Sequence, residues 1–143
     1  MTVADNDANY ASRKRLESLI ERLSDEQLAT PMANDWTVAA YLAHVAFFDR
    51  RALELARRFT TAEAVYASPV DIHVLNDALL PQWRLLDPRA AANDALAAAG
   101  AVDAALAALP DDVLRRNVEL DGISLNRASH RVMHLNEIEP LFP

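Results

Sequence analysis

The sequence predicts an all-α protein that folds as a four-helix bundle. Glycine occurs only twice, aromatic residues make up 6% of the chain and alanine is the commonest residue, a composition that favours helices over strands. Apolar residues recur at spacings of three and four in several long segments, which prolines or capping residues separate. The length of 143 residues suits one domain, so we expect residues 1–143 to form a single bundle domain.

The first predicted helix covers residues 6–23. Its apolar side chains recur at helical spacing, as expected for one buried face: Leu16, Leu19, Ile20 and Leu23. Ser24 begins a cap-like sequence for a short turn, and Pro31 prevents a longer helix there. A loop over residues 30–36 follows.

Thr37 is a suitable N-cap for a second long helix that reaches about residue 59 and has a broad apolar face. Residues 60–70 then predict a connection that closes at Pro69. A third helical segment is expected to begin near Asp71 and to be interrupted by Pro81.

Asp87 followed by proline is a start signal for a helix over residues 88–109. Residues 111–122 predict a polar connection with a short turn at most. Ser124 or Asn126 is then expected to open the last helix, which continues to about residue 140. These segments give the four main helices of the predicted bundle.

Charge and cysteine content exclude several classes of function. With 14 basic and 21 acidic residues the net charge is −7, which repels nucleic-acid phosphates, so no nucleic-acid partner is expected. The chain has no cysteine, so any thiol chemistry requires an external thiol. No segment looks like a signal peptide or a membrane span. We therefore expect a cytoplasmic protein with no membrane partner.

The histidines are the main candidates for chemistry. His130 and His134 are four residues apart on the last predicted helix, so both imidazoles lie on one face and can chelate one metal ion. A solvated or core pair is the simpler interpretation of such spacing, and a core role is the simpler one for His44 in the second helix. In a bundle, however, three inward-facing imidazoles from two helices can meet at one level and leave a position open for water or substrate.

The segment DWTVAAYLAHVAFFDR at residues 35–50, followed by the late HxxxH motif, resembles the DinB-like superfamily. This superfamily includes the N-terminal domain of mycothiol-dependent maleylpyruvate isomerase, and the resemblance covers nearly the whole chain in order and spacing. Its members are four-helix bundles that hold a divalent metal, often zinc or nickel, and many are dimers. The resemblance implies that His44, His130 and His134 are metal ligands and that the chain forms a homodimer.

The resemblance also implies an activity. Members include thiol transferases that use mycothiol or bacillithiol, so we expect a metal-dependent transferase or isomerase that acts on a small-molecule substrate with a low-molecular-weight thiol. The isomerases carry a second domain, whereas this chain ends at Pro143, so we expect a reaction other than maleylpyruvate isomerisation. The alternatives are a metal-dependent hydrolase and a non-catalytic stress-response or binding module.

Three further polar residues are candidates near such a centre: His73, Asn76 and Glu137. His73 and Asn76 lie at the start of the third helical segment and could orient a substrate or carry a proton, although a surface or capping role is the simpler interpretation of His73. Glu137 follows His134 by three residues and could be a fourth ligand or a hydrogen-bond acceptor behind His134.

The second predicted helix carries a stripe of charged residues: Asp49, Arg50, Arg51, Arg57 and Arg58. It could anchor a carboxylate of a substrate or cofactor, but a solvated face is the simpler interpretation. Trp36 and Trp83 are predicted to be packing residues.

Overall fold

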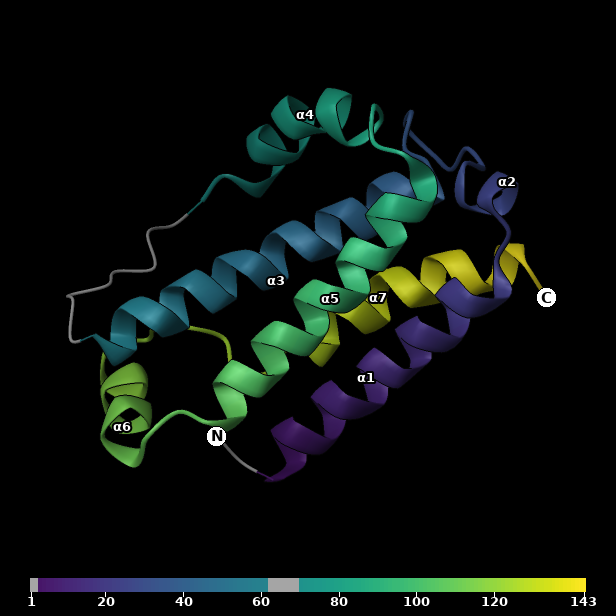
Figure 1. Ribbon diagram of the computed structural model, residues 1–143. Helices are drawn as coiled ribbons and strands as arrows, with labels where there is room; N and C mark the ends of the chain where they lie inside the picture. The colour runs from purple at the N-terminus through teal and green to yellow at the C-terminus, as the bar shows by residue number, and fades with distance from the viewer. Residues whose placement is uncertain (1–2, 62–69) are drawn as a thin grey trace.

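Helices account for the regular secondary structure of the computed structural model, which describes residues 3–61 and 70–143 (Figure 1). The elements are α1 (Val3–Arg22), α2 (Asp25–Leu28), α3 (Val38–Thr60), α4 (Ile72–Trp83), α5 (Pro88–Ala107), α6 (Asp111–Glu119), α7 (Ala128–Ile138) and the 3-10 turn η1 (Glu139–Leu141). The predicted all-α class is confirmed. The connection expected over residues 60–70 falls mainly on residues 62–69, outside the described ranges.

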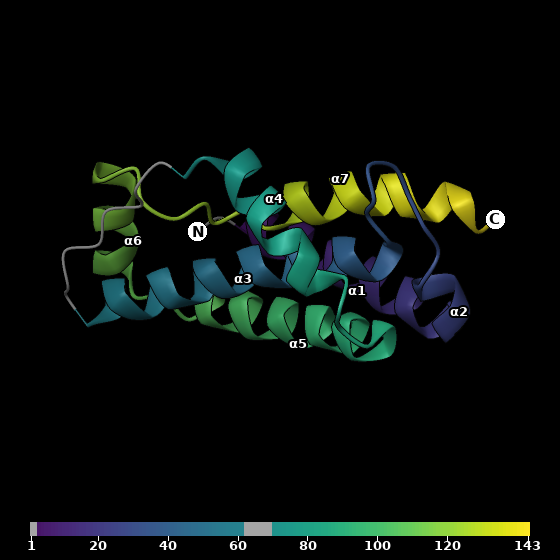
Figure 2. The ribbon, with the colours of Figure 1, turned by 90° about the horizontal axis from the view of Figure 1, so that it is seen from above.

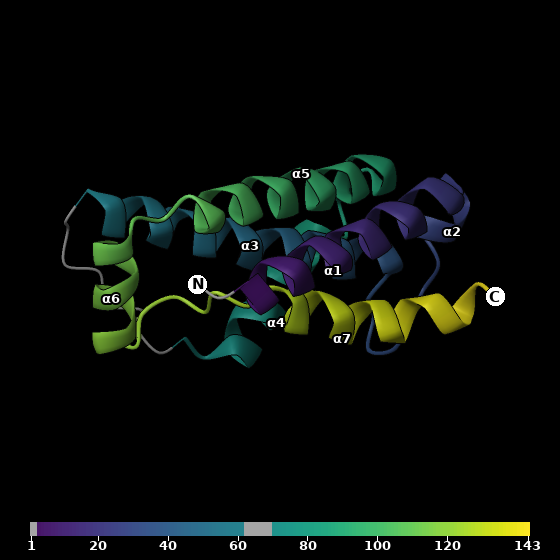
Figure 3. The ribbon, with the colours of Figure 1, turned by 90° about the horizontal axis from the view of Figure 1, so that it is seen from below.

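Helices α1, α3, α5 and α7 form the predicted four-helix bundle (Figures 2 and 3). Helix α3 packs on α5 and α7, and α1 packs on the same two helices, so α1 and α3 lie diagonally across the bundle. Helix α4 lies along the outside of α3, and α6 lies across one end of the bundle. No single helix in the described ranges is long and apolar enough to cross a bilayer.

The apolar spacing read from the sequence places side chains in the bundle core. Leu16 of α1, Leu42 of α3 and Leu135 of α7 are almost fully buried. They belong to one cluster with the small side chains of α5, which allow close helix packing: Ala92, Ala95, Ala98 and Ala99. Since each buried leucine stabilises the fold by about 1.5–3 kcal/mol, this cluster contributes to holding α7 against α1 and α3.

Local capping determines where most helices begin, as the sequence predicts. The Thr37 side chain accepts from the amide of Ala40 at the start of α3, and Asp87 does the same for Ala90 at the start of α5. Ser24 forms a capping box with Gln27 in α2. These oxygens satisfy backbone N–H groups that have no partner within the helix.

Arg131 of α7 is a fully buried cation that contacts three other helices. Its Nε donates to Asp49 Oδ2 of α3 over 2.9 Å, and its terminal nitrogens donate to Asp103 of α5 over 2.8 and 3.1 Å. It also donates to the carbonyl of Asn9 of α1 over 3.2 Å. Burial by itself lowers the pKa of Arg131, but the Asp103 and Asp49 carboxylates raise this pKa above its ordinary value. The guanidinium therefore stays charged inside the bundle.

Two more arginines extend this arrangement. Arg127 Nε donates to Asp49 Oδ1 over 3.0 Å, and Arg13 Nε donates to Asp103 Oδ2 over 3.1 Å. We call the five residues the buried charge network: Arg13, Asp49, Asp103, Arg127 and Arg131. The sequence predicts that Asp49 belongs to an exposed charged stripe, which either anchors a carboxylate or is solvated. Both predictions are wrong for Asp49, because its side chain is 0% exposed and forms ion pairs with Arg127 and Arg131.

Helix α6 corrects the prediction of a polar connection with at most a short turn. The segment is short and mostly polar, although its few apolar residues lie on one side of the helix. Val113 packs in a cluster with Phe59 at the end of α3. The buried Asn117 side chain exchanges two hydrogen bonds with the backbone of Ile123, over 3.0 and 2.6 Å. Contacts with residues outside the segment therefore stabilise α6 as a helix.

Two other boundaries differ from the prediction. Helix α7 begins at Ala128 instead of Ser124 or Asn126, although the Asn126 side chain accepts from the amide of Ser129 as a cap would. Helix α4 runs through Pro81, which lies in its last turn and removes one backbone hydrogen bond there.

The buried charge network predicts a large stability effect for Arg131→Met. This change leaves Asp49 and Asp103 short of a buried cation, so we expect a loss of about 3–5 kcal/mol in the free energy of unfolding by urea. The matched control is Arg57→Met, because Arg57 pairs with Glu54 on the surface. The control should cost less than about 1 kcal/mol. Equal costs for the two variants would contradict the assignment.

Candidate metal centre

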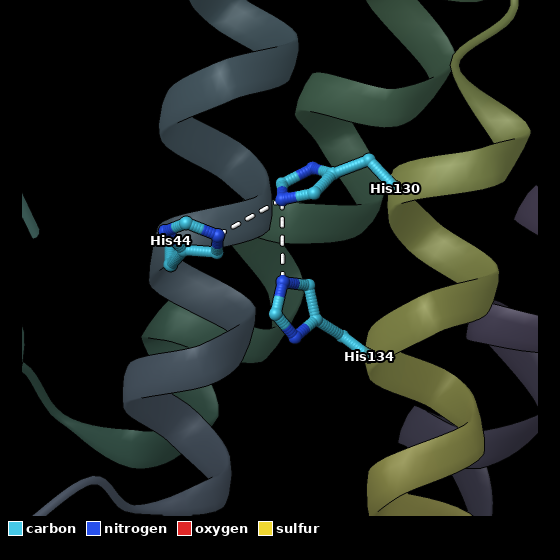
Figure 4. A group of neighbouring side chains, drawn as sticks. All are labelled: His44, His130 and His134. Atoms are coloured by element: carbon cyan, nitrogen blue, oxygen red, sulfur yellow. Dashed lines mark hydrogen bonds between the residues drawn. The ribbon is translucent and has the colours of Figure 1, made fainter. Parts of the chain in front are cut away.

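Three histidines from two neighbouring helices converge on one point (Figure 4). His44 comes from α3, and His130 and His134 come from successive turns of α7. The Nε2 atom of His130 lies 2.9 Å from Nε2 of His44 and 3.2 Å from Nε2 of His134. One ring nitrogen from each residue lies within 4.8 Å of the others. We call this group the histidine trio, and it brings together the three ligands that the family resemblance implies.

The other ring nitrogens of the trio differ in their surroundings. His44 Nδ1 lies 3.0 Å from Asn76 Oδ1, and because a carbonyl oxygen only accepts, Nδ1 carries the proton. His134 Nδ1 lies 3.5 Å from Glu137 Oε2. This distance is at the limit for a hydrogen bond, and the Nδ1 atoms of His130 and His134 are both buried without a hydrogen-bond partner.

Burial keeps the trio neutral near neutral pH. Burial, with repulsion from His134, lowers the pKa of His44 to about 4. Burial also lowers the pKa of His130 to about 3, helped by the other two histidines and by Arg127 and Arg131. The pKa of His134 is lowered by burial too, and Glu137 opposes that shift. Each residue therefore has a lone pair available for a cation.

The donor set fits a divalent transition metal. Three neutral imidazole nitrogens are ligands that zinc and nickel accept, and three protein ligands are typical of catalytic zinc sites. Without a cation, the close Nε2 atoms depend on a shared proton, since His44 Nε2 has only a lone pair to offer. A cation among the three would take the place of this proton and accept the lone pairs of the Nε2 atoms. The residues present therefore suit a metal, and its identity is not determined by them.

Aromatic rings surround the trio. The His44 ring lies 4.9 Å from the Phe48 ring, 5.5 Å from Trp83 and 5.6 Å from Trp36, centroid to centroid. Tyr41 lies 5.0 Å from His134 in the same way. Trp36 and Trp83, which the sequence predicts to be packing residues, both lie beside His44. Trp36 lies close to the start of the His44 helix, whereas no local pattern connects Trp83 with it.

Two neighbouring cavities border the trio and share His44, His73, Asn76 and His134 in their walls. The first, the Arg127 cavity, has a volume of about 450 Å³, and it adds these residues to the trio: Phe48, Ile72, His73, Asn76, Ser124, Asn126, Arg127, Ser129 and Met133. Among the described residues, no carboxylate lines it. The second, the Glu137 cavity, has about 380 Å³ and contains Asp77 and Glu137 beside Trp36 and Tyr41. Small molecules could therefore approach the trio through either cavity.

The structure separates the roles of the other predicted site residues. Asn76 contacts His44 directly, and the exposed His73 borders both cavities. Glu137 Oε2 lies 3.5 Å from Nδ1 of His134, on the side of that ring away from the converging Nε2 atoms, and Glu137 is outside the group of three candidate ligands. Arg50 pairs with Asp94 outside both cavities. Arg127, which sequence analysis does not single out, is the arginine that lines a cavity beside the trio.

Comparison with known proteins identifies one family. The sequence profile of the mycothiol maleylpyruvate isomerase N-terminal domain matches residues 10–139. This family is a member of the DinB-like superfamily, so the resemblance carried by the tryptophan-to-histidine segment and the late HxxxH motif is confirmed. No curated protein and no solved structure matches the chain.

The lowered pKa values predict that acid destabilises the metal-free protein. Unfolded histidines take up protons near an ordinary pKa of about 6.5, whereas folded His44 and His130 do so only at about 4 and about 3. Their contribution to stability is therefore complete above about pH 6.5 and is lost as the pH falls toward about 4. Each group adds up to about 1.4 kcal/mol per pH unit in this window.

Urea unfolding of chelator-treated protein between about pH 5 and pH 7 measures this slope. His130→Asn should flatten it, and the control His73→Asn, at an exposed histidine, should leave it unchanged. A wild-type stability that does not change over this range would contradict the assignment.

Proposed function

Because the chain belongs to the mycothiol maleylpyruvate isomerase N-terminal domain family, we propose that it is a metal-dependent enzyme that uses a low-molecular-weight thiol, as a transferase or an isomerase. The observation that carries this proposal is the convergence of three neutral imidazole nitrogens beside two cavities. An isolated metal-binding pair on a surface helix would have neither the third nitrogen nor the cavities.

The chain's own residues have distinct roles in this proposal. His44, His130 and His134 would hold a divalent metal through Nε2, with zinc or nickel the best candidates. Held by three uncharged ligands, such an ion supplies a Lewis acid that lowers the pKa of a water or thiol bound to it. The rings of Phe48 and Trp83 pack beside the buried His44, and this low-polarity surrounding strengthens electrostatic interactions in the centre.

An external thiol fits the composition of the chain. The protein has no cysteine, so the sulfur that attacks an electrophilic small molecule must come from a separate thiol. The two neighbouring cavities would give room for two reactants beside the trio. The Arg127 cavity has apolar walls from Phe48, Ile72 and Met133, which suit a partly apolar reactant.

Metal content is the first test. Wild-type protein prepared with trace zinc and nickel should contain stoichiometric metal, and His44→Ala or His130→Ala should lower the occupancy because one of three ligands is lost. The matched control His73→Ala removes an exposed histidine outside the trio and should keep full occupancy. Elemental analysis measures the result. Wild-type protein without stoichiometric metal would refute the proposal.

Thiol binding is the second test. Addition of N-acetylcysteine to the cobalt-loaded protein should produce a sulfur-to-cobalt charge-transfer band in the near ultraviolet. N-acetylserine, which replaces sulfur by oxygen, should not, and His134→Ala should lose the band with the metal. An unchanged spectrum at saturating thiol would refute thiol use and favour a hydrolase or a non-catalytic module.

A further inference from the structure

We propose that Asn76 is a positioning residue that holds the proton of His44 on Nδ1 and so directs the Nε2 lone pair of His44 toward the other two histidines. The inference deepens the proposed function and rests on it for the consequence, which is tighter metal binding. The position of the proton itself can be measured in the metal-free protein.

The geometry of one hydrogen bond is the starting point. Asn76 Oδ1 lies 3.0 Å from His44 Nδ1, and a carbonyl oxygen can only accept, so Nδ1 donates. A neutral imidazole has one proton, which leaves Nε2 of His44 as a bare lone pair 2.9 Å from Nε2 of His130. A metal ligand needs that lone pair, and the alternative tautomer would place a proton there instead.

No other histidine of the trio is fixed in this way. The Nδ1 atoms of His130 and His134 are buried and have no hydrogen-bond partner. Within the described residues, Asn76 is therefore the side chain that hydrogen-bonds to the second nitrogen of a trio member. Once His44 Nε2 is an acceptor, the proton in the 2.9 Å contact must come from His130 Nε2. Asn76 therefore also determines that His130 donates and His44 accepts in this hydrogen bond.

Helix α4 delivers Asn76 from outside the bundle. The end of α4 is anchored where Trp83, Leu79 and Leu80 pack on a cluster with Ala39 and Ala43 of α3. The start of α4 has exposed apolar side chains, with Ile72 at 51% and Val74 at 64% exposure. Asn76 thus forms its hydrogen bond at a part of α4 that has little apolar packing of its own.

An amide suits this role better than a carboxylate would for a reactive centre. An Asp at this position would also fix the proton on Nδ1, but it would add a negative charge behind the ligand and raise its basicity. The neutral amide fixes the tautomer without that charge. A dication held by the trio would then keep more of its acidifying power.

The tautomer is tested first, in the metal-free protein. Long-range proton–nitrogen NMR spectra of isotope-labelled wild-type protein should show His44 protonated on Nδ1 and unprotonated on Nε2. In Asn76→Leu, which removes the acceptor at similar size, the Nε2–H form should become populated. The control Asn93→Leu, at an exposed residue of α5, should keep the wild-type pattern. An unchanged His44 tautomer in Asn76→Leu would overturn the proposal.

Metal affinity is tested second, by competition with a chromophoric zinc chelator. Asn76→Leu should bind zinc about 10–100-fold more weakly than wild type, whereas Asn76→Asp, which keeps the acceptor, should match or exceed wild type. If Asn76→Asp loses as much affinity as Asn76→Leu, Asn76 acts only through packing and the proposal fails. A wild-type protein that shows the expected tautomer but binds no zinc or nickel would refute the proposed function while supporting the role of Asn76.

Discussion

Arg131 lies where α1, α3, α5 and α7 meet, and its charge is the constraint on which the arrangement of α7 depends. A guanidinium with no exposed surface is tolerated only because Asp49 and Asp103 hold it from two sides. Sliding α7 by one turn would separate these charges inside the bundle. Since His130 directly precedes Arg131 and His134 lies about one turn after it, the pairs that fix Arg131 also fix both histidines opposite His44. The metal centre is therefore a consequence of the charge network as much as of the apolar core.

The same network acts on the trio electrostatically. Burial, followed by the neighbouring His134 and His44, lowers the pKa of His130 to about 3, and the positive charges of Arg127 and Arg131 act in the same direction. The network thus adds to the effects that keep His130 neutral, which is the form that binds a metal. Arg127 is also the point at which the network reaches a cavity next to the trio. One set of charges positions α7, maintains the ligands in their neutral form and contributes a cation to the wall of a cavity.

Much of the fold could be predicted because its signals are local. The starts of α3 and α5 follow from Thr37 and Asp87, whose side chains cap the helix that begins directly after them. Helix α6 was missed because its stability comes from Phe59 and Ile123, which belong to other segments. The buried position of Asp49 was missed for the same reason, since nothing near it in sequence indicates its pairing with α7. The homodimer, the cytoplasmic location and the thiol remain predictions.

The sequence by itself determined the helical class, the bundle and the spacing that puts His130 and His134 on one face of a helix. These features depend on residues within a few positions of one another, and helix geometry converts such spacing directly into shared faces. Only the tertiary structure decided that His44 meets the pair, that Glu137 lies behind His134 and that Asn76 of α4 holds the second nitrogen of His44. Those contacts join residues from different helices, and their geometry depends on how the helices pack, which the local spacing of residues does not encode.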